Sequence, residues 1–133
     1  MNNGSLLALI TLLTLFLGLF VKYNQGKVRH KKRTRYSAKE LRQDLGSRAT
    51  IVQFSTTFCS ECRAAKAMVN DVVKELTDIA YIELDAESNL DLVRRVDIRS
   101  TPTTIFLDKN GYEIARAKGA PKRDQLIKAI QAL

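Results

Sequence analysis

The chain has 133 residues, of which 45% are hydrophobic and 27% charged, with 6 glycines and 2 prolines. This length and composition fit roughly one globular domain and exclude a collagen-like, a disordered or a multidomain protein. The net charge of +8 is unevenly placed: residues 1–35 carry seven basic and no acidic side chains, whereas residues 36–133 carry 15 basic and 14 acidic ones. Because the larger part is nearly neutral, no nucleic acid partner is predicted.

An apolar segment occupies the amino-terminal end of the chain. Residues 6–21 contain no charged side chain, and with Gly4 and Ser5 the run measures about 27 Å as a helix. A hydrocarbon core is about 30 Å thick, so residues 1–23 are predicted to form one transmembrane anchor. Within this anchor, residues 4–23 are predicted to contact the membrane. The alternative is a cleaved signal peptide, which the uncharged head and the lack of an Ala-x-Ala-like site disfavour.

Residues 24–36 are predicted to form a basic linker. The seven basic residues follow the apolar run within fourteen positions, and such residues stay on the cytoplasmic side. The domain at residues 37–133 is therefore predicted to face the cytoplasm, with an extracytoplasmic domain as the alternative. Because the linker is highly charged, no strand is predicted in it. His30, the only histidine, is interpreted as a solvated linker residue.

The first elements of the domain follow from capping signals and hydrophobic periodicity. Ser37 and Glu40 form a capping box, which predicts a helix over residues 37–45 that Gly46 ends. Residues 50–55 are predicted to form a buried strand, although Gln53 interrupts its apolar run. Residues 59–76 repeat apolar side chains at helical spacing and predict a long amphipathic helix.

The second half of the domain continues the alternation. Residues 81–85 predict a strand, and a cap at Ser88 opens a short helix. Residues 103–107 and 112–117 predict two strands joined by a hairpin turn. A last helix is predicted to start near Pro121, with its apolar face at Leu126, Ile127, Ile130 and Leu133. This order predicts an α/β domain with a mixed four-stranded sheet and helices on both faces.

The two cysteines, Cys59 and Cys62, lie where a buried strand leads into a helix. A cysteine at a helix amino terminus faces unpaired N–H groups that stabilise its thiolate, and a second cysteine one turn later is close enough to bridge. Cys59 is predicted to attack and Cys62 to resolve. The alternatives are an incidental pair or a zinc half-site, but zinc requires four ligands and the chain adds only the distant His30.

These motifs, in this order, resemble the thioredoxin family over residues 37–133. The matches are the CxxC pair, the Thr101–Pro102 dipeptide before a strand, and Gly119 before the last helix. The resemblance implies a thioredoxin-like fold, a cis bond before Pro102, a Thr101 backbone that pairs with substrate, and a Gly119 that lines a peptide groove. The substrate-binding candidates are Phe58, Ser60, Glu61, Thr101, Pro102 and Gly119.

The chain also departs from the family pattern. Most thioredoxins have Trp-Cys-Gly-Pro-Cys-Lys, whereas residues 58–63 are Phe-Cys-Ser-Glu-Cys-Arg. Glu61 disfavours a nearby thiolate, and the helix amino terminus offsets part of that effect. Gln53 stands where the family commonly has a buried Asp that helps to deprotonate the resolving cysteine, so slow resolution at this proton-relay position is predicted. The alternative is that Gln53 is a satisfied core amide and water serves as the base.

The predicted function is that of a thiol-disulfide oxidoreductase that reduces or exchanges disulfides in protein substrates through Cys59 and Cys62. The resemblance implies no metal or organic cofactor, and a thiol or a reductase as electron donor. Two alternatives stay open. One is a non-catalytic peptide-binding module of the same fold, and the other is an extracytoplasmic oxidase or reductase.

Overall fold

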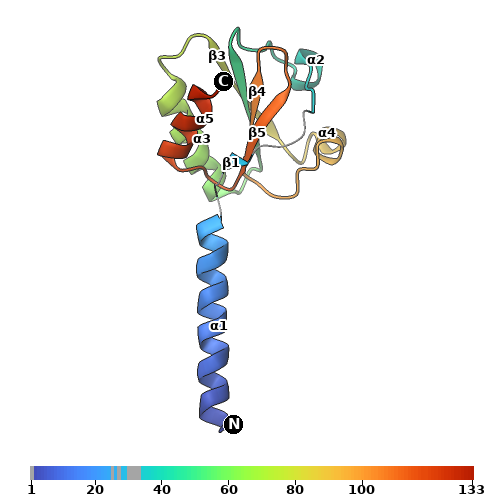
Figure 1. The fold of residues 1–133 in the computed structure, drawn as a ribbon. Coiled ribbons are helices and arrows are strands. Elements are labelled where there is room, and N and C mark those ends of the chain that lie inside the picture. The colour runs from blue at the N-terminus through green and yellow to red at the C-terminus, as the bar shows by residue number, and fades with distance from the viewer. Residues whose placement is uncertain (1, 25, 27, 30–33) are drawn as a thin grey trace.

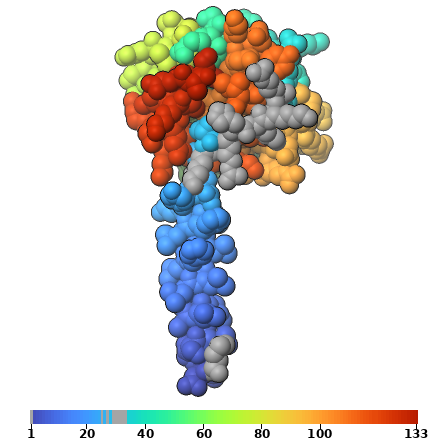
Figure 2. Space-filling view, in the orientation of Figure 1, coloured from blue at the N-terminus to red at the C-terminus, as the bar shows by residue number. Residues whose placement is uncertain are grey.

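The computed structural model describes residues 2–24, 26, 28–29 and 34–133. Helix α1, Asn3–Asn24, projects from a head that contains a sheet flanked by helices (Figure 1). None of its side chains is buried, and no other described element packs along it in Figure 2. Its 22 residues, with a mean hydropathy of 2.4 over a window of 18, suit a membrane span or a signal sequence.

The head is built on a mixed sheet with the strand order β1-β5-β4-β2-β3. Strand β2 (Ala49–Ser55) runs parallel to β3 (Ile79–Asp85) and antiparallel to β4 (Thr103–Asp108), which pairs in turn with β5 (Glu113–Lys118). The predicted four-stranded mixed sheet is thereby confirmed. Strand β2 lies between β3 and β4, and all of its residues are buried.

Strand β1, Val28–Arg29, was not predicted. It pairs antiparallel with Ala117 and Arg116 at the edge of β5. The prediction that this charged segment forms no strand is therefore wrong. An edge strand needs only its backbone groups for pairing, so charged side chains do not prevent it. Tyr36, at the end of the same segment, is 0% exposed. Within the predicted basic linker at residues 24–36, strand β1 and Tyr36 thus pack onto the head.

Four helices cover the sheet: α2 (Ala38–Leu41), α3 (Ser60–Val73), α4 (Leu90–Arg95) and α5 (Arg123–Gln131). Figure 1 shows α3 and α5 together on one side of the sheet and α2 and α4 on the other. Alternate residues of β2 point to opposite faces, so Val52 packs with the α2 and α4 side and Ile51 with the α3 and α5 side. The helices on both faces are as predicted.

The first short helix is shorter than predicted. Its capping box is present: the Ser37 hydroxyl accepts from the Glu40 N–H, and the Glu40 carboxylate accepts from the Ser37 N–H. The helix nevertheless ends at Leu41, because Arg42 takes the left-handed conformation with φ 55°. Gly46 therefore does not end it. A one-turn helix is set by its capping residues more than by its periodicity.

Two helix starts also differ from the prediction. Helix α4 has Asn89 at its N-cap position, one residue after the predicted Ser88, whose hydroxyl donates to the carboxylate of Asp85. Helix α5 has Lys122 at its N-cap, so Pro121 precedes the helix and does not occupy its first turn. Pro121 is buried, which gives it a packing role in the segment before the helix.

Candidate functional site

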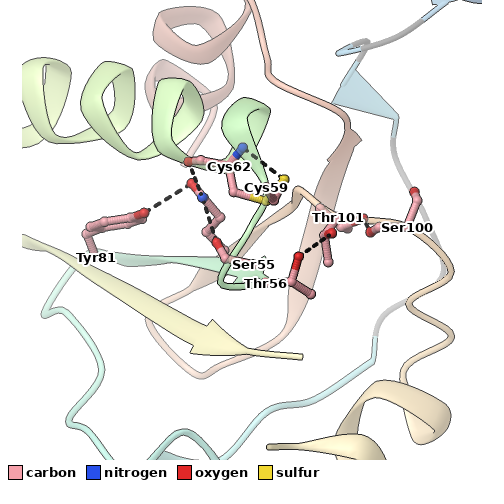
Figure 3. Close-up of a disulfide and its surroundings, with 9 residues drawn as sticks. Ser55, Thr56, Cys59, Cys62, Tyr81, Ser100 and Thr101 are labelled. Carbon is pink, nitrogen blue, oxygen red and sulfur yellow. Dashed lines mark hydrogen bonds between the residues drawn. A yellow bond between two sulfur atoms is a disulfide. The ribbon is translucent and has the colours of Figure 1, made fainter. Parts of the chain in front are cut away.

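The two cysteines lie at the end of the sheet where β2 meets α3 (Figure 3). Strand β2 ends at Ser55, and α3 begins at Ser60 with Cys59 as its N-cap residue. Cys59 and Cys62 form a disulfide, with 5.2 Å between their Cα atoms. The Cys62 N–H donates to the Cys59 Sγ atom at 3.1 Å. The pair therefore occupies the predicted strand-to-helix position.

The two sulfur atoms have different surroundings. Cys59 is partly exposed, whereas Cys62 is only 2% exposed. Cys59 lies at the amino terminus of α3, where the Cys62 N–H and the positive end of the helix dipole stabilise a thiolate. A reactant from solvent therefore reaches the first cysteine, and the second stays covered beneath it.

A second loop meets the cysteine turn. The bond between Thr101 and Pro102 is cis. The hydroxyl groups of Thr101 and Thr56 lie 3.4 Å apart, which joins this loop to the turn before Cys59. The Gly119 N–H donates to the Pro102 carbonyl oxygen at 2.8 Å, and Gly119 has φ 78°. The structure thus brings together the three residues that the family resemblance singled out outside the CxxC motif.

The remaining predicted substrate contacts lie around Cys59. Ser60 and Glu61 are exposed in the first turn of α3. Phe58, immediately before Cys59, is 96% exposed. A large apolar ring in that state has no partner within the described chain to remove it from water. Its place beside the disulfide is the one that the family resemblance predicted for a substrate contact, and that role stays a prediction.

Gln53 lies beneath the disulfide and is 0% exposed. Its Nε2 group donates to the Ser55 hydroxyl at 2.9 Å and to the Cys62 backbone oxygen at 3.0 Å. Its Oε1 atom accepts from the Tyr81 hydroxyl at 3.0 Å (Figure 3). The amide is therefore a satisfied core group, as the alternative interpretation held. It supports the backbone of Cys62 and has no basic atom to offer the thiol.

Tyr81 is a site residue that the sequence analysis missed. Burial, with the nearby Glu83 charge, raises the pKa of its hydroxyl, so it stays protonated and donates to Gln53. The signal was present in the sequence: in the parallel register Tyr81 pairs with Ile51, two residues from Gln53 and on the same face of the sheet. A polar residue on a buried strand requires a hydrogen-bond partner, and the next strand is where such a partner lies.

A hollow of about 360 Å³ opens beside Cys62. It is lined by polar and charged side chains, among them an ion pair between Lys66 and Glu83. The other polar lining residues are Ser55, Thr56, Thr57, Arg63 and Asp85. A hollow of this size and polarity admits water, which is the base that the alternative interpretation of Gln53 requires.

A buried ion pair supports the loop that leads to Thr101. Arg116, 5% exposed, donates to both carboxylate oxygens of Glu113, at 2.5 and 2.7 Å, and to the Val96 carbonyl oxygen at 3.2 Å. The Tyr36 hydroxyl donates to Glu113 at 3.0 Å. Burial, together with the Glu113 charge, raises the pKa of Tyr36, so it remains a donor. The sequence analysis also missed this group.

Among the residues that the structure describes, no three His, Cys, Asp or Glu side chains gather in a way that suits a metal ion. His30, which was weighed as a distant third zinc ligand beside the two cysteines, lies outside the described residues.

Comparison with known proteins places the chain in a family. The family model for thioredoxin matches residues 28–132. A thioredoxin of Ophiophagus hannah is 32% identical over 86 residues, which cover 65% of this chain and 80% of that protein. Thioredoxin-2 of Saccharomyces cerevisiae is 31% identical over 75 residues, which cover 56% and 71%.

Solved structures agree with these relatives. Thioredoxin F from spinach chloroplast is 30% identical, with a TM-score of 0.58 and coverage of 65% of this chain and 71% of that one. A thioredoxin from Nicotiana alata is 27% identical, with a TM-score of 0.58 and coverage of 65% and 73%. The chain belongs to the thioredoxin family, and its Cys59–Cys62 pair is that of a thiol-disulfide oxidoreductase.

Changing Gln53 to Asp is expected to speed resolution of the mixed disulfide near neutral pH and to lower the stability of the domain. Desolvation raises the pKa of a buried Asp above the value of about 3.9 for a free one, which suits it to accept a proton. The folded variant then binds a proton that the unfolded chain has released, so its free energy of unfolding falls as pH rises above about 4. The loss of the amide donors to Ser55 and Cys62 adds about 1–3 kcal/mol.

Rapid-mixing measurement of mixed-disulfide decay between pH 6 and 8 tests this expectation. Gln53→Asn is the matched control, because it shortens the side chain equally without adding a base. It should lose stability and gain no rate. Equal decay in the wild type and Gln53→Asp would assign deprotonation to water in the adjacent hollow.

Proposed function

We propose that the protein is a membrane-anchored reductase of protein disulfides whose domain faces the cytoplasm. The observation that carries the catalytic part is the placement of Cys59 at the amino terminus of α3, bonded to Cys62 and beside the Thr101–Pro102 loop. The apolar helix α1 and the basic residues that follow it support the anchored topology.

The proposed reaction consists of two exchanges. The Cys59 thiolate attacks one sulfur of a substrate disulfide, and the substrate's other sulfur leaves as a thiolate. The Cys62 thiolate then attacks the Cys59 sulfur, which releases the second substrate thiolate and closes the Cys59–Cys62 disulfide. Two electrons pass to the substrate, and solvent protonates its thiolates as pH requires. A thiol or a reductase then returns two electrons to the pair, so this proposal uses no metal or organic cofactor.

The substrate peptide is proposed to lie between the cysteine turn and the Thr101 loop. The Thr101 backbone would pair with it, and Pro102 and Gly119 would line the groove. Phe58 offers an exposed apolar surface beside Cys59, with Ser60 and Glu61 on the first turn of α3. Glu61 would disfavour acidic side chains next to the substrate cysteine.

Turnover with a protein disulfide tests the proposal. The full chain in detergent micelles, supplied with a dithiol, should reduce an interchain disulfide such as that of insulin faster than the dithiol alone. Reversible oxidation of Cys59 and Cys62, with one disulfide formed per protein, should accompany turnover. A peptide-binding module would instead bind the substrate without accelerating its reduction.

The cytoplasmic orientation predicts that a membrane-impermeant maleimide does not label Cys59 in intact cells, because the reagent stays outside. The cells are first treated with a membrane-permeant reductant, so that the thiol is free. Permeabilised cells provide the control, in which Cys59 should be labelled. Labelling in intact cells would place the domain outside and favour an extracytoplasmic oxidase or reductase.

A further inference from the structure

The membrane helix joins the head through a very short connection. Helix α1 ends at Asn24, and the Gly26 N–H already donates to the Lys118 carbonyl oxygen of β5 at 2.5 Å. Two residue steps reach at most about 7 Å, so the point of attachment lies close to the end of α1. The short strand Val28–Arg29 then fixes the following chain to β5.

The point of attachment is also part of the candidate active site. Lys118 is followed by Gly119, whose N–H donates to the Pro102 carbonyl oxygen. The backbone of Gly26 approaches Ala120 so closely that a Cβ atom at residue 26 would clash with the Ala120 carbonyl oxygen. The end of the membrane helix is thus linked through one loop to the substrate groove.

The cysteines lie at the same end of the sheet. Thr101, beside Pro102, contacts Thr56 in the turn that leads to Cys59. Figure 1 shows α1 meeting the head at the end where β2 finishes and α3 begins, and the opposite end of the sheet points away from it. The end of the head that carries Cys59 and the Thr101–Pro102 loop is called the rim here. If α1 crosses a membrane, the rim therefore lies near the membrane surface.

The chemistry of this rim suits that location. Lys118 and Lys122 are exposed on the two sides of Gly119 and Ala120. Near anionic headgroups each such charge contributes about 1 kcal/mol of attraction. Phe58, almost fully exposed beside Cys59, offers an apolar contact to a chain that emerges from the bilayer.

We propose that the substrates of Cys59 are disulfides in membrane-anchored proteins, placed within a few residues of the membrane surface. This inference rests on the proposed function and names its substrate class. A substrate in the same membrane is held at the height of the rim, which raises its effective concentration. The dithiol form breaks the substrate disulfide and gives it two electrons, and a soluble dithiol then reduces the Cys59–Cys62 disulfide again.

The test uses the full chain in vesicles of phosphatidylcholine and phosphatidylglycerol. Two single-span reporter peptides carry the same disulfide loop, one three residues from the membrane and the other beyond a flexible spacer of about 40 residues. Dithiothreitol serves as donor and is removed by gel filtration before an impermeant maleimide detects new outer thiols, and the rate with Cys59→Ser is subtracted. We expect the membrane-proximal reporter to be reduced about tenfold faster or more.

A variant with a flexible insert of about 30 residues between Asn24 and Gly26 should lose this preference. The same insert between Asn2 and Asn3 is the matched control and should keep it. Equal rates on the two reporters, or a preference that survives the insert after Asn24, would overturn the inference. Insulin reduction in micelles separates the two proposals: activity there with equal reporter rates overturns only the substrate class, whereas no activity above Cys59→Ser overturns the proposed function.

Discussion

Changing Cys59 to Ser is expected to abolish disulfide reduction, whereas changing Cys62 to Ser should leave a protein that attacks its substrates and stays bound to them. Cys59 is the partly exposed cysteine at the amino terminus of α3, where the helix stabilises a thiolate. A serine hydroxyl is not ionised near neutral pH, so turnover should fall at least about a thousandfold. The rate of insulin reduction measures this loss.

The Cys62 variant tests the order of the two steps. Cys62 is 2% exposed and is bonded to Cys59, so it is placed to attack the Cys59 sulfur and not an incoming protein. Without Cys62, no thiol of the chain remains to attack the mixed disulfide between Cys59 and the substrate. Non-reducing electrophoresis should show a covalent complex with Cys62→Ser and none with Cys59→Ser or the double variant. Complexes with Cys59→Ser alone would reverse the roles.

The sequence was sufficient to predict the central part of the fold. Strands β2 to β5 combine β-branched and apolar residues with clear turn signals, and α3 repeats its apolar residues at helical spacing. The cysteine pair was equally clear, because a CxxC motif at a strand-to-helix junction has few other uses. These features depend on local patterns, which a single sequence contains in full.

The missed features depend on contacts between distant residues. Strand β1 is held by backbone bonds at a sheet edge, so its charged sequence carries no signal for it. Tyr36 and Glu113 are 77 residues apart, yet their side chains bond in the core. Three of the six residues of β5 are charged, a composition that indicates solvent exposure, but the neighbouring elements bury Glu113 and Arg116.

Changing Arg116 to Met is expected to lower the free energy of unfolding by about 3–5 kcal/mol, the largest stability change that we predict for a single substitution. The side chains of Arg116 and Glu113 are 6% and 0% exposed. Removal of the guanidinium leaves the buried Glu113 carboxylate without its positive partner, although the Tyr36 hydroxyl still donates to it, and leaves the Val96 carbonyl oxygen without the Arg116 donor. Unfolding of the full chain in micelles by guanidinium chloride, followed by tyrosine fluorescence, measures the fall in the free energy of unfolding.

Two controls separate the cost of an unpaired buried charge from the value of the pair itself. Arg123→Met removes an arginine from an exposed pair with Asp71 and should change stability by about 1 kcal/mol or less. The double change Arg116→Met with Glu113→Leu removes both buried charges and should recover most of the stability lost in the single variant. If the double variant is as unstable as Arg116→Met alone, the loss of stability comes from the missing hydrogen bonds between Arg116 and the Val96 carbonyl oxygen.

The loop that begins at Val96 leads to Thr101 and Pro102. That result would therefore make Arg116 a positioning residue for the substrate groove, and the single variant should then show a raised KM for insulin at unchanged kcat.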